Sequence, residues 1–255
     1  MQKPMNQLVS RIAFLYFAVV LAFSTACVAQ SGAFIVSQHG HAVGTASYNF
    51  TAGPKGYSST SVVRIAMQGL DYSLSKTEIL STANHLRHVQ LSGAVNGSAV
   101  NVTAAPDAAQ ILLNISANGH SNTARLAQHS AAVFLADFDP GALETLLALA
   151  VASNNADLWA ILPKQTGSQI GSIEAIELAT YADEKGTLDG KQVVVHHLVA
   201  NIAGESTQLF SGPENQLLQA ELPQQGFALI RKGFALTPPA KAGAAPDQSG
   251  PSAQQ

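Results

Sequence analysis

The sequence predicts a mainly β protein in which a curved antiparallel meander is wrapped around one amphipathic helix. Between Ala33 and Leu236, short runs of alternating apolar and polar residues recur with turn residues between them, as in antiparallel sheets. One segment near residue 140 has helical spacing instead. A few of the predicted strands are apolar on both faces, so another element has to cover their second face.

Turn dipeptides set the boundaries of the meander. Asn96-Gly97 and Asp189-Gly190 favour two-residue type I′ hairpins, since both central residues of this turn need a positive φ. The segment 53–56, Gly-Pro-Lys-Gly, indicates a third turn. The predicted strands are Phe34–Gln38, Val43–Thr51, Tyr57–Gln68, Asp71–Leu80, His85–Val95, Ser98–Ala104, Ile111–Ala117, Leu158–Leu162, Ile170–Tyr181, Gln192–Ala203, Leu217–Leu222 and Phe227–Leu236.

The helix is predicted over Pro140 to Ala152. Asp139 is a suitable N-cap, and Pro140 fits the first turn. The residues that form its apolar stripe are Leu143, Leu146, Leu147, Ala150 and Val151. Such a helix needs a sheet to lie against, either as ordinary core or as a plug over a concave face.

The segment 192–202 supports a covered, curved sheet. Val193, Val195 and Val199 share one face, while Leu198, Ala200 and Ile202 are among the apolar residues of the other. A helix, a second sheet or a ligand has to cover the second face. A sheet curved around the 140–152 helix explains this pattern.

The first 29 residues have the three parts of a secretory signal peptide. Lys3 and Arg11 form a basic start, Ile12–Phe23 is an apolar run too short to span a bilayer, and small residues lead to Ala29. We expect cleavage after Ala29 and therefore a periplasmic or secreted protein with no stable membrane span. An uncleaved anchor and a lipoprotein acylated at Cys27 are the alternatives.

Cleavage would leave a mature chain whose composition excludes several classes of function. Cys27 is the only cysteine, so its loss excludes thiol catalysis, thiolate metal sites and disulfides. Without Lys3 and Arg11 the chain has 11 basic and 16 acidic residues, a net charge of −5, which does not suit nucleic acids or anionic membranes. Residues 30–236 are expected to form one domain, and the Pro/Ala/Gly/Ser/Gln-rich segment 237–255 a disordered tail.

Two segments carry a resemblance to a known group. The pattern near the C-terminus is a strand with Leu218, Glu221 and Leu222, then Pro223, then a strand from Phe227 that carries Arg231. Near the N-terminus, FIVSQHGHAVGTASYNF forms a similar first hairpin with His39-Gly40 at its turn. Together they resemble secreted and periplasmic half-barrel proteins related to the lipoprotein carriers of the LolA and LolB type. The resemblance implies a half-barrel fold and a concave face for an apolar or lipid-like ligand.

Sequence motifs for chemistry are lacking. The eight histidines have no accompanying cysteine and no H-E-x-x-H motif, so we expect no metal site. The segment ADFDPGALE resembles an aspartic protease motif, but Pro140 stands in place of the hydroxyl residue and the helix cap is the better interpretation. No nucleophile elbow and no nucleotide-binding loop occurs, so no cofactor is expected. Asn49, Asn96, Asn101 and Asn114 begin N-x-[ST] sequons, which matter only in a glycosylating compartment.

The leading hypothesis is a non-enzymatic, exported half-barrel that binds an apolar or lipid-like ligand between the sheet and the helix. Its predicted lining, chosen from large apolar residues on or beside the helix, is Phe134, Phe138, Leu146, Trp159 and Val195. The alternative is a structural or protein-interaction module of the cell envelope whose concave face is filled by its own side chains. An enzyme of unknown type is the third possibility.

Overall fold

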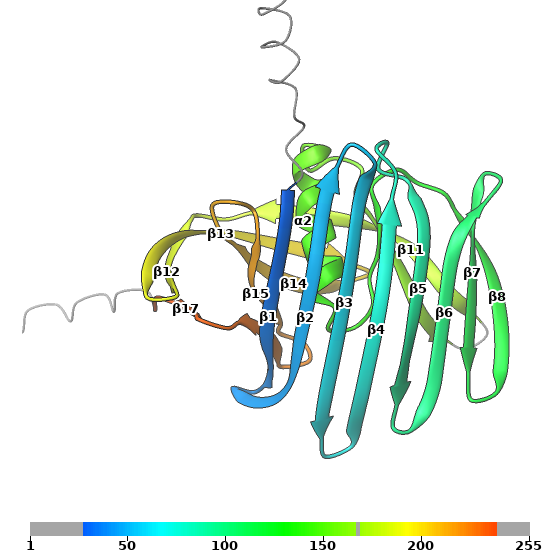
Figure 1. Ribbon diagram of the computed structural model, residues 1–255, viewed down its shortest axis with the longest axis horizontal. Helices are drawn as coiled ribbons and strands as arrows, with labels where there is room; N and C mark the ends of the chain where they lie inside the picture. The colour runs from blue at the N-terminus through cyan, green and yellow to red at the C-terminus, as the bar shows by residue number, and fades with distance from the viewer. Residues whose placement is uncertain (1–27, 167–168, 239–255) are drawn as a thin grey trace, which may run out of the picture.

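The computed structural model describes residues 28–166 and 169–238, and it confirms the predicted fold class. Among these residues, one 17-stranded sheet, curved and unclosed, surrounds a single helix, α2, at Pro140–Ala152 (Figure 1). Residues 1–27 of the predicted signal peptide and residues 239–255 of the predicted tail lie outside the described residues. The strands are β1 Val28–Gln38, β2 His41–Gly53, β3 Gly56–Met67, β4 Leu70–Leu80, β5 Leu86–Val95, β6 Ser98–Asp107, β7 Gln110–Ala117, β8 His120–Ala127, β9 Ala132–Phe134, β10 Trp159–Thr166, β11 Gln169–Thr180, β12 Glu184–Leu188, β13 Lys191–Ile202, β14 Glu205–Ser211, β15 Leu217–Leu222, β16 Phe227–Arg231 and β17 Phe234–Leu236.

The sheet consists of an N-terminal meander joined to a C-terminal one through β1. Each strand from β1 to β8 pairs antiparallel with the next. The other edge of β1 pairs with β16, and the ladder continues through β15, β14, β13 and β11 to β10. β9 and β10 form a short parallel pair. The first and last parts of the chain therefore share one continuous sheet.

The predicted hairpins lie where the turn chemistry placed them. Asn96 and Gly97 have φ of 49° and 81°, and Asp189 and Gly190 have 50° and 77°, as a type I′ turn requires. The predicted turn at 53–56 is also present, since Gly53 and Gly56 are paired across it. These dipeptides fix the register of the strands on either side of each turn.

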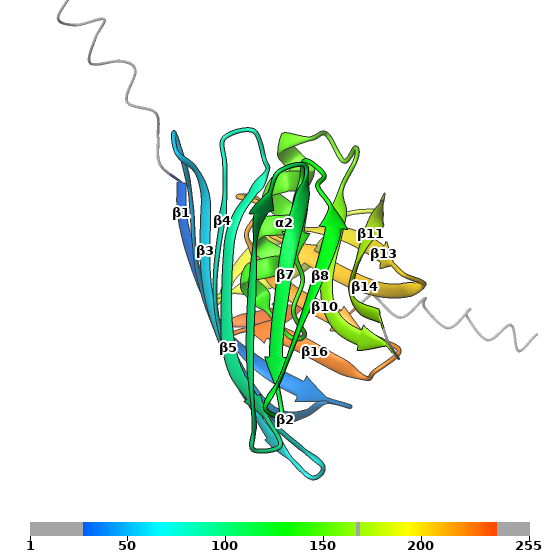
Figure 2. The ribbon, with the colours of Figure 1, turned by 90° about the vertical axis from the view of Figure 1, so that its right-hand side faces the viewer.

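The helix lies inside the curve of the sheet. Figure 2 shows α2 between β1, β3 and β4 on one side and β10, β11 and β13 on the other. It packs chiefly against β2 and β3, with contacts to β9 and β15. The predicted amphipathic stripe is wrong in detail, because most residues of α2 are buried on all sides and Val151, assigned to the stripe, is 62% exposed. A sheet that curves around a helix buries more than one of its faces.

The doubly apolar strand β13 is covered on both faces along part of its length, although Val194 is 50% exposed. Ala200 and Ile202 belong to the main core. Val195 faces away from it and packs with Phe210, Leu218 and Phe234 in a second, small cluster. The pairing of β12 with both β13 and β17 brings Phe234 over this face, so the chain itself covers the upstream part of β13.

Within the described part of the chain, no helix has the length and apolar character needed to cross a membrane.

Candidate functional site

A cavity of about 330 Å³ lies between the concave face of the C-terminal meander and the start of α2. Its walls come from β10 and β11 and from β13 to β16, together with the segment 135–139 and the first turn of the helix. Its apolar lining includes Phe138, Leu143, Leu162, Ile202, Leu222 and Leu229. This volume is at the lower end of the range typical of small-molecule pockets.

Polar and charged side chains line part of the same cavity. Asp137 and Lys164 form an ion pair, with 3.3 Å between Oδ1 and Nζ, and both side chains are about half exposed. Glu174 on β11 is half-buried, and Glu205 accepts a hydrogen bond from the Gln225 amide at 3.4 Å. The cavity therefore combines an apolar floor with an acidic rim.

A second cavity, of about 170 Å³, adjoins the first on the side of β4 to β6. Leu135, Ala136, Asp137 and Lys164 line both cavities, so the ion pair stands at the boundary between them. Tyr72 lines the second cavity and donates a hydrogen bond from its hydroxyl to the backbone carbonyl of Asp137 at 3.1 Å. Burial, reinforced by the charges of Asp137 and Asp139, raises the pKa of Tyr72, which keeps this donor protonated.

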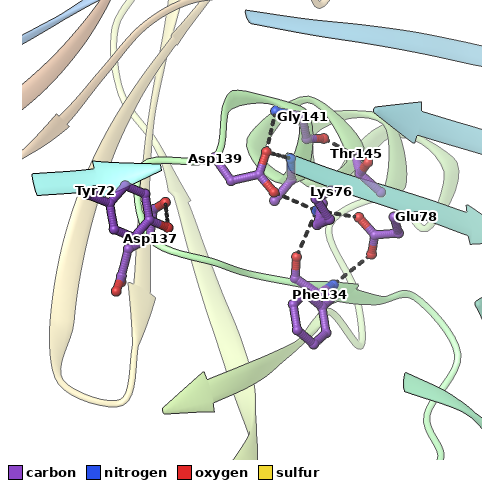
Figure 3. Close-up of polar contacts among 9 residues, drawn as sticks. Tyr72, Lys76, Glu78, Phe134, Asp137, Asp139, Gly141 and Thr145 are labelled. Carbon is purple, nitrogen blue, oxygen red and sulfur yellow. Dashed lines mark hydrogen bonds and ion pairs between the residues drawn. The ribbon is translucent and has the colours of Figure 1, made fainter. Parts of the chain in front are cut away.

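A fully buried ion cluster supports the wall of the first cavity (Figure 3). The Lys76 ammonium lies 2.9 Å from Glu78 Oε2 and 2.6 Å from Asp139 Oδ2, and it donates to the carbonyl of Phe134 at 3.0 Å. The Asp139 contact is an ion pair without hydrogen-bond alignment. Glu78 Oε1 accepts from the backbone N–H of Phe134 at 2.7 Å. Strand β4 is thereby joined to the end of β9 and to the start of α2.

Asp139 also caps the helix. Its Oδ1 accepts from the backbone N–H groups of Gly141 and Ala142 at 2.9 and 3.2 Å, as the predicted N-cap requires. The other oxygen faces Lys76, so one carboxylate satisfies the helix terminus and balances a buried cation. The aspartic protease interpretation gains nothing from this geometry.

The ionisation of the cluster reflects two opposing effects. Burial alone would lower the pKa of Lys76, but the charges of Asp139 and Glu78 outweigh it and the pKa lies above its ordinary value. For Glu78, burial outweighs the Lys76 charge and the Phe134 N–H, and the pKa is raised. Lys76 therefore stays charged, while Glu78 takes up a proton more readily than an exposed glutamate.

A second buried carboxylate holds the middle of α2. Glu144 Oε2 accepts from the Tyr48 hydroxyl on β2 and from the backbone N–H of Leu217 on β15, both at 2.8 Å. Burial raises the pKa of Glu144 in spite of these two donors and the nearby charge of Arg231. These bonds join the helix to both parts of the sheet, to β2 in the N-terminal meander and to β15 in the C-terminal one.

The five predicted lining residues do not form one site. Phe138 lines the first cavity. Phe134 and Leu146 are fully buried in the main core, and Val195 belongs to the second cluster. Trp159 is half-buried, lies outside the residues that line either cavity, and stacks on His129 with 3.7 Å between ring centroids. Ligand contact by any of them stays a prediction.

Sequence reasoning missed the polar part of the lining. Glu174 and Ser172 lie in a strand that was predicted, and their alternation with Ile173 was the available signal. Thr207 lies on β14, which was absent from the predicted strands. Among the described residues, no group of three or more histidine, cysteine, aspartate or glutamate side chains is arranged to hold a metal ion.

Comparisons of the chain with protein-family models, with curated proteins and with solved structures found no match.

Proposed function

We propose that this protein is a non-enzymatic binding protein that holds an apolar or lipid-like ligand in the 330 Å³ cavity between the concave sheet and α2. The observation that carries the proposal is the position of this cavity. It lies between the C-terminal meander and the first turn of the helix, and its floor is apolar. Concave sites with an apolar floor and a few polar groups are typical of small-ligand binding.

Two further features support a binding site more than a reactive one. The buried titratable groups near the cavity, Lys76, Glu78 and Asp139, satisfy one another and the backbone. Lys76 and Glu78 do not line the cavity, and both carboxylate oxygens of Asp139 are occupied, one by the helix N–H groups and the other by Lys76. Their arrangement holds the wall in place.

Export and kinship are part of the same proposal. The segment 1–29 has the composition of a signal peptide, and an exported carrier would meet lipids in the cell envelope. An open sheet around one helix is also the architecture that the resemblance to LolA- and LolB-type carriers implies. Kinship with these carriers stays a proposal based on that architecture and the two sequence segments.

The second candidate is a structural or protein-interaction module of the envelope. The near-complete burial of α2 favours it, because the helix fills much of the concave face with the chain's own side chains. On this alternative the cavity is a packing defect and no ligand is bound.

The first experiment is native mass spectrometry of the protein purified from its own envelope fraction, with lipid extraction of any adduct. It is followed by titration with N-phenylnaphthylamine, whose fluorescence rises in apolar surroundings. We expect saturable binding that Thr207→Phe weakens at least about tenfold, since the ring would occupy the cavity. Thr60→Phe is the matched control, because Thr60 is exposed on β3 and does not line the cavity.

A clean mass and no saturable probe binding would favour the structural module. Equal binding by the two variants would place the probe outside the cavity. Melting curves of both variants show whether Thr207→Phe has lost its fold, in which case Ser172→Phe provides the second test of the same cavity.

A further inference from the structure

We infer that the ligand of this cavity is a cationic amphiphile, with an apolar body on the floor and a positively charged group at the rim. The inference rests on the proposed function and adds the charge of the ligand. It follows from the placement and pairing of the charged side chains that line the cavity.

Two of the lining carboxylates already have a cation. Asp139 is paired with Lys76 at 2.6 Å in the core. Asp137 is paired with Lys164 at 3.3 Å at the boundary with the second cavity. The charge of Lys164 is thus already paired with Asp137. Among the described residues, no other lysine or arginine lines the cavity.

Two lining carboxylates are not matched by a cation. Within the described ranges, Glu174 and Glu205 make no ion pair within 4.0 Å with a lysine, an arginine or a histidine. Glu205 receives only a neutral amide donor, that of Gln225. Glu174 is half-buried and shares its side of the β10–β11 pair with Ala160, which is fully buried. The rim therefore carries two negative charges that the protein leaves uncompensated.

These two charges favour a cationic head group on any amphiphile whose apolar body lies on the apolar floor of the cavity. A cationic group at the rim gains two attractive partners, whereas an anionic group meets two like charges. Each partly exposed pair contributes a factor of about two to five in affinity. We therefore expect a cationic ligand to bind about tenfold more tightly than a neutral one and an anionic ligand about tenfold more weakly. The preference shrinks at high salt, because the groups are partly exposed.

The test uses three probes with the same decyl chain and different heads: decyltrimethylammonium, decyl maltoside and decyl phosphate. The affinity of each probe is measured by its displacement of N-phenylnaphthylamine from the full chain. The titrations are made below the concentration of micelle formation and at two salt concentrations. The double variant Glu174→Gln, Glu205→Gln removes the unmatched charges. Glu177→Gln, Glu214→Gln is the matched control, since both residues are exposed and do not line the cavity.

We expect the affinity order cationic, neutral, anionic in the native protein and in the control. In the Glu174/Glu205 variant the three affinities should converge to within about threefold. Equal affinity of the three probes in the native protein, or a preference for the phosphate, would overturn the inference while the binding function stands. So would a cationic preference that survives in the Glu174/Glu205 variant. Failure of all three probes to displace N-phenylnaphthylamine would remove the binding function itself.

Discussion

Replacement of Lys76 by methionine should destabilise the protein far more than the same change at Lys164. Methionine keeps the length and apolar character of the side chain, but it leaves Glu78 and Asp139 buried without their cation. Removing one partner of a buried ion pair costs about 3–5 kcal/mol, a large part of the 5–15 kcal/mol that stabilises a typical domain. Lys164 and Asp137 are about half exposed, so Lys164→Met should cost at most about 1 kcal/mol.

Urea denaturation followed by circular dichroism measures the difference. With a slope of about 2–3 kcal/mol per molar urea, Lys76→Met should lower the midpoint by about 1–2.5 M. The loss should be smaller at pH 4 than at pH 8, because the stranded carboxylates can take up protons in acid. Adding Glu78→Gln and Asp139→Asn should recover part of it, since asparagine still caps α2 and no buried charge is left in this cluster. Equal midpoint shifts for Lys76→Met and Lys164→Met would refute this reasoning.

Three further predictions concern the helix and Trp159. Because burial raises the pKa of Glu144 above 4.5, the native state binds this proton more tightly than the unfolded chain, and the free energy of unfolding should fall as pH rises from about 4.5. Glu144→Gln should flatten this slope in urea titrations from pH 4 to 8, and exposed Glu177→Gln should leave it unchanged. Leu146→Ala should cost about 2–5 kcal/mol and Val151→Ala less than about 0.5 kcal/mol in the same assay; equal costs would mean that the helix is not enclosed. Trp159 should keep its emission maximum when the cavity is saturated with decyl maltoside, since it lines neither cavity; a shift of more than a few nanometres would place the ligand elsewhere.

Sequence reasoning predicted best where local chemistry and structure coincide. Asp139-Pro140 marked the start of α2 to the residue, because a side-chain cap and a fixed φ act within one turn. Asn96-Gly97 and Asp189-Gly190 marked hairpins for the same local reason. Strand β8 was missed although Asn118 and Gly119 form a similar turn before it, since its residues HSNTARLA contain little apolar alternation.

The polar core was harder to predict, although one signal was present. Lys76 and Glu78 stand in phase with Leu74 and Leu80 on β4, so their inward direction could be read from the alternation. Their partner Asp139 is about sixty residues away, and only the tertiary fold brings the three together. Enclosure of α2 on most sides likewise depends on the curvature of the sheet, which the sequence of the helix does not encode.

The way in which the sheet ends has a mechanical consequence for the cavity. β8 packs beside β11, and Gly171 has a positive φ and fits closely against Leu113 of β7. Across this seam the described residues show no ladder pairing of β8 with β10 or β11, whereas β1 and β16 are joined by a full antiparallel ladder. Separation of β8 from β11 thus parts side chains but breaks no backbone hydrogen-bond ladder. We therefore expect this edge of the sheet to move more easily than the β1–β16 junction. Because Gly171 and Ser172 line the cavity, movement at this seam would change the volume of the cavity.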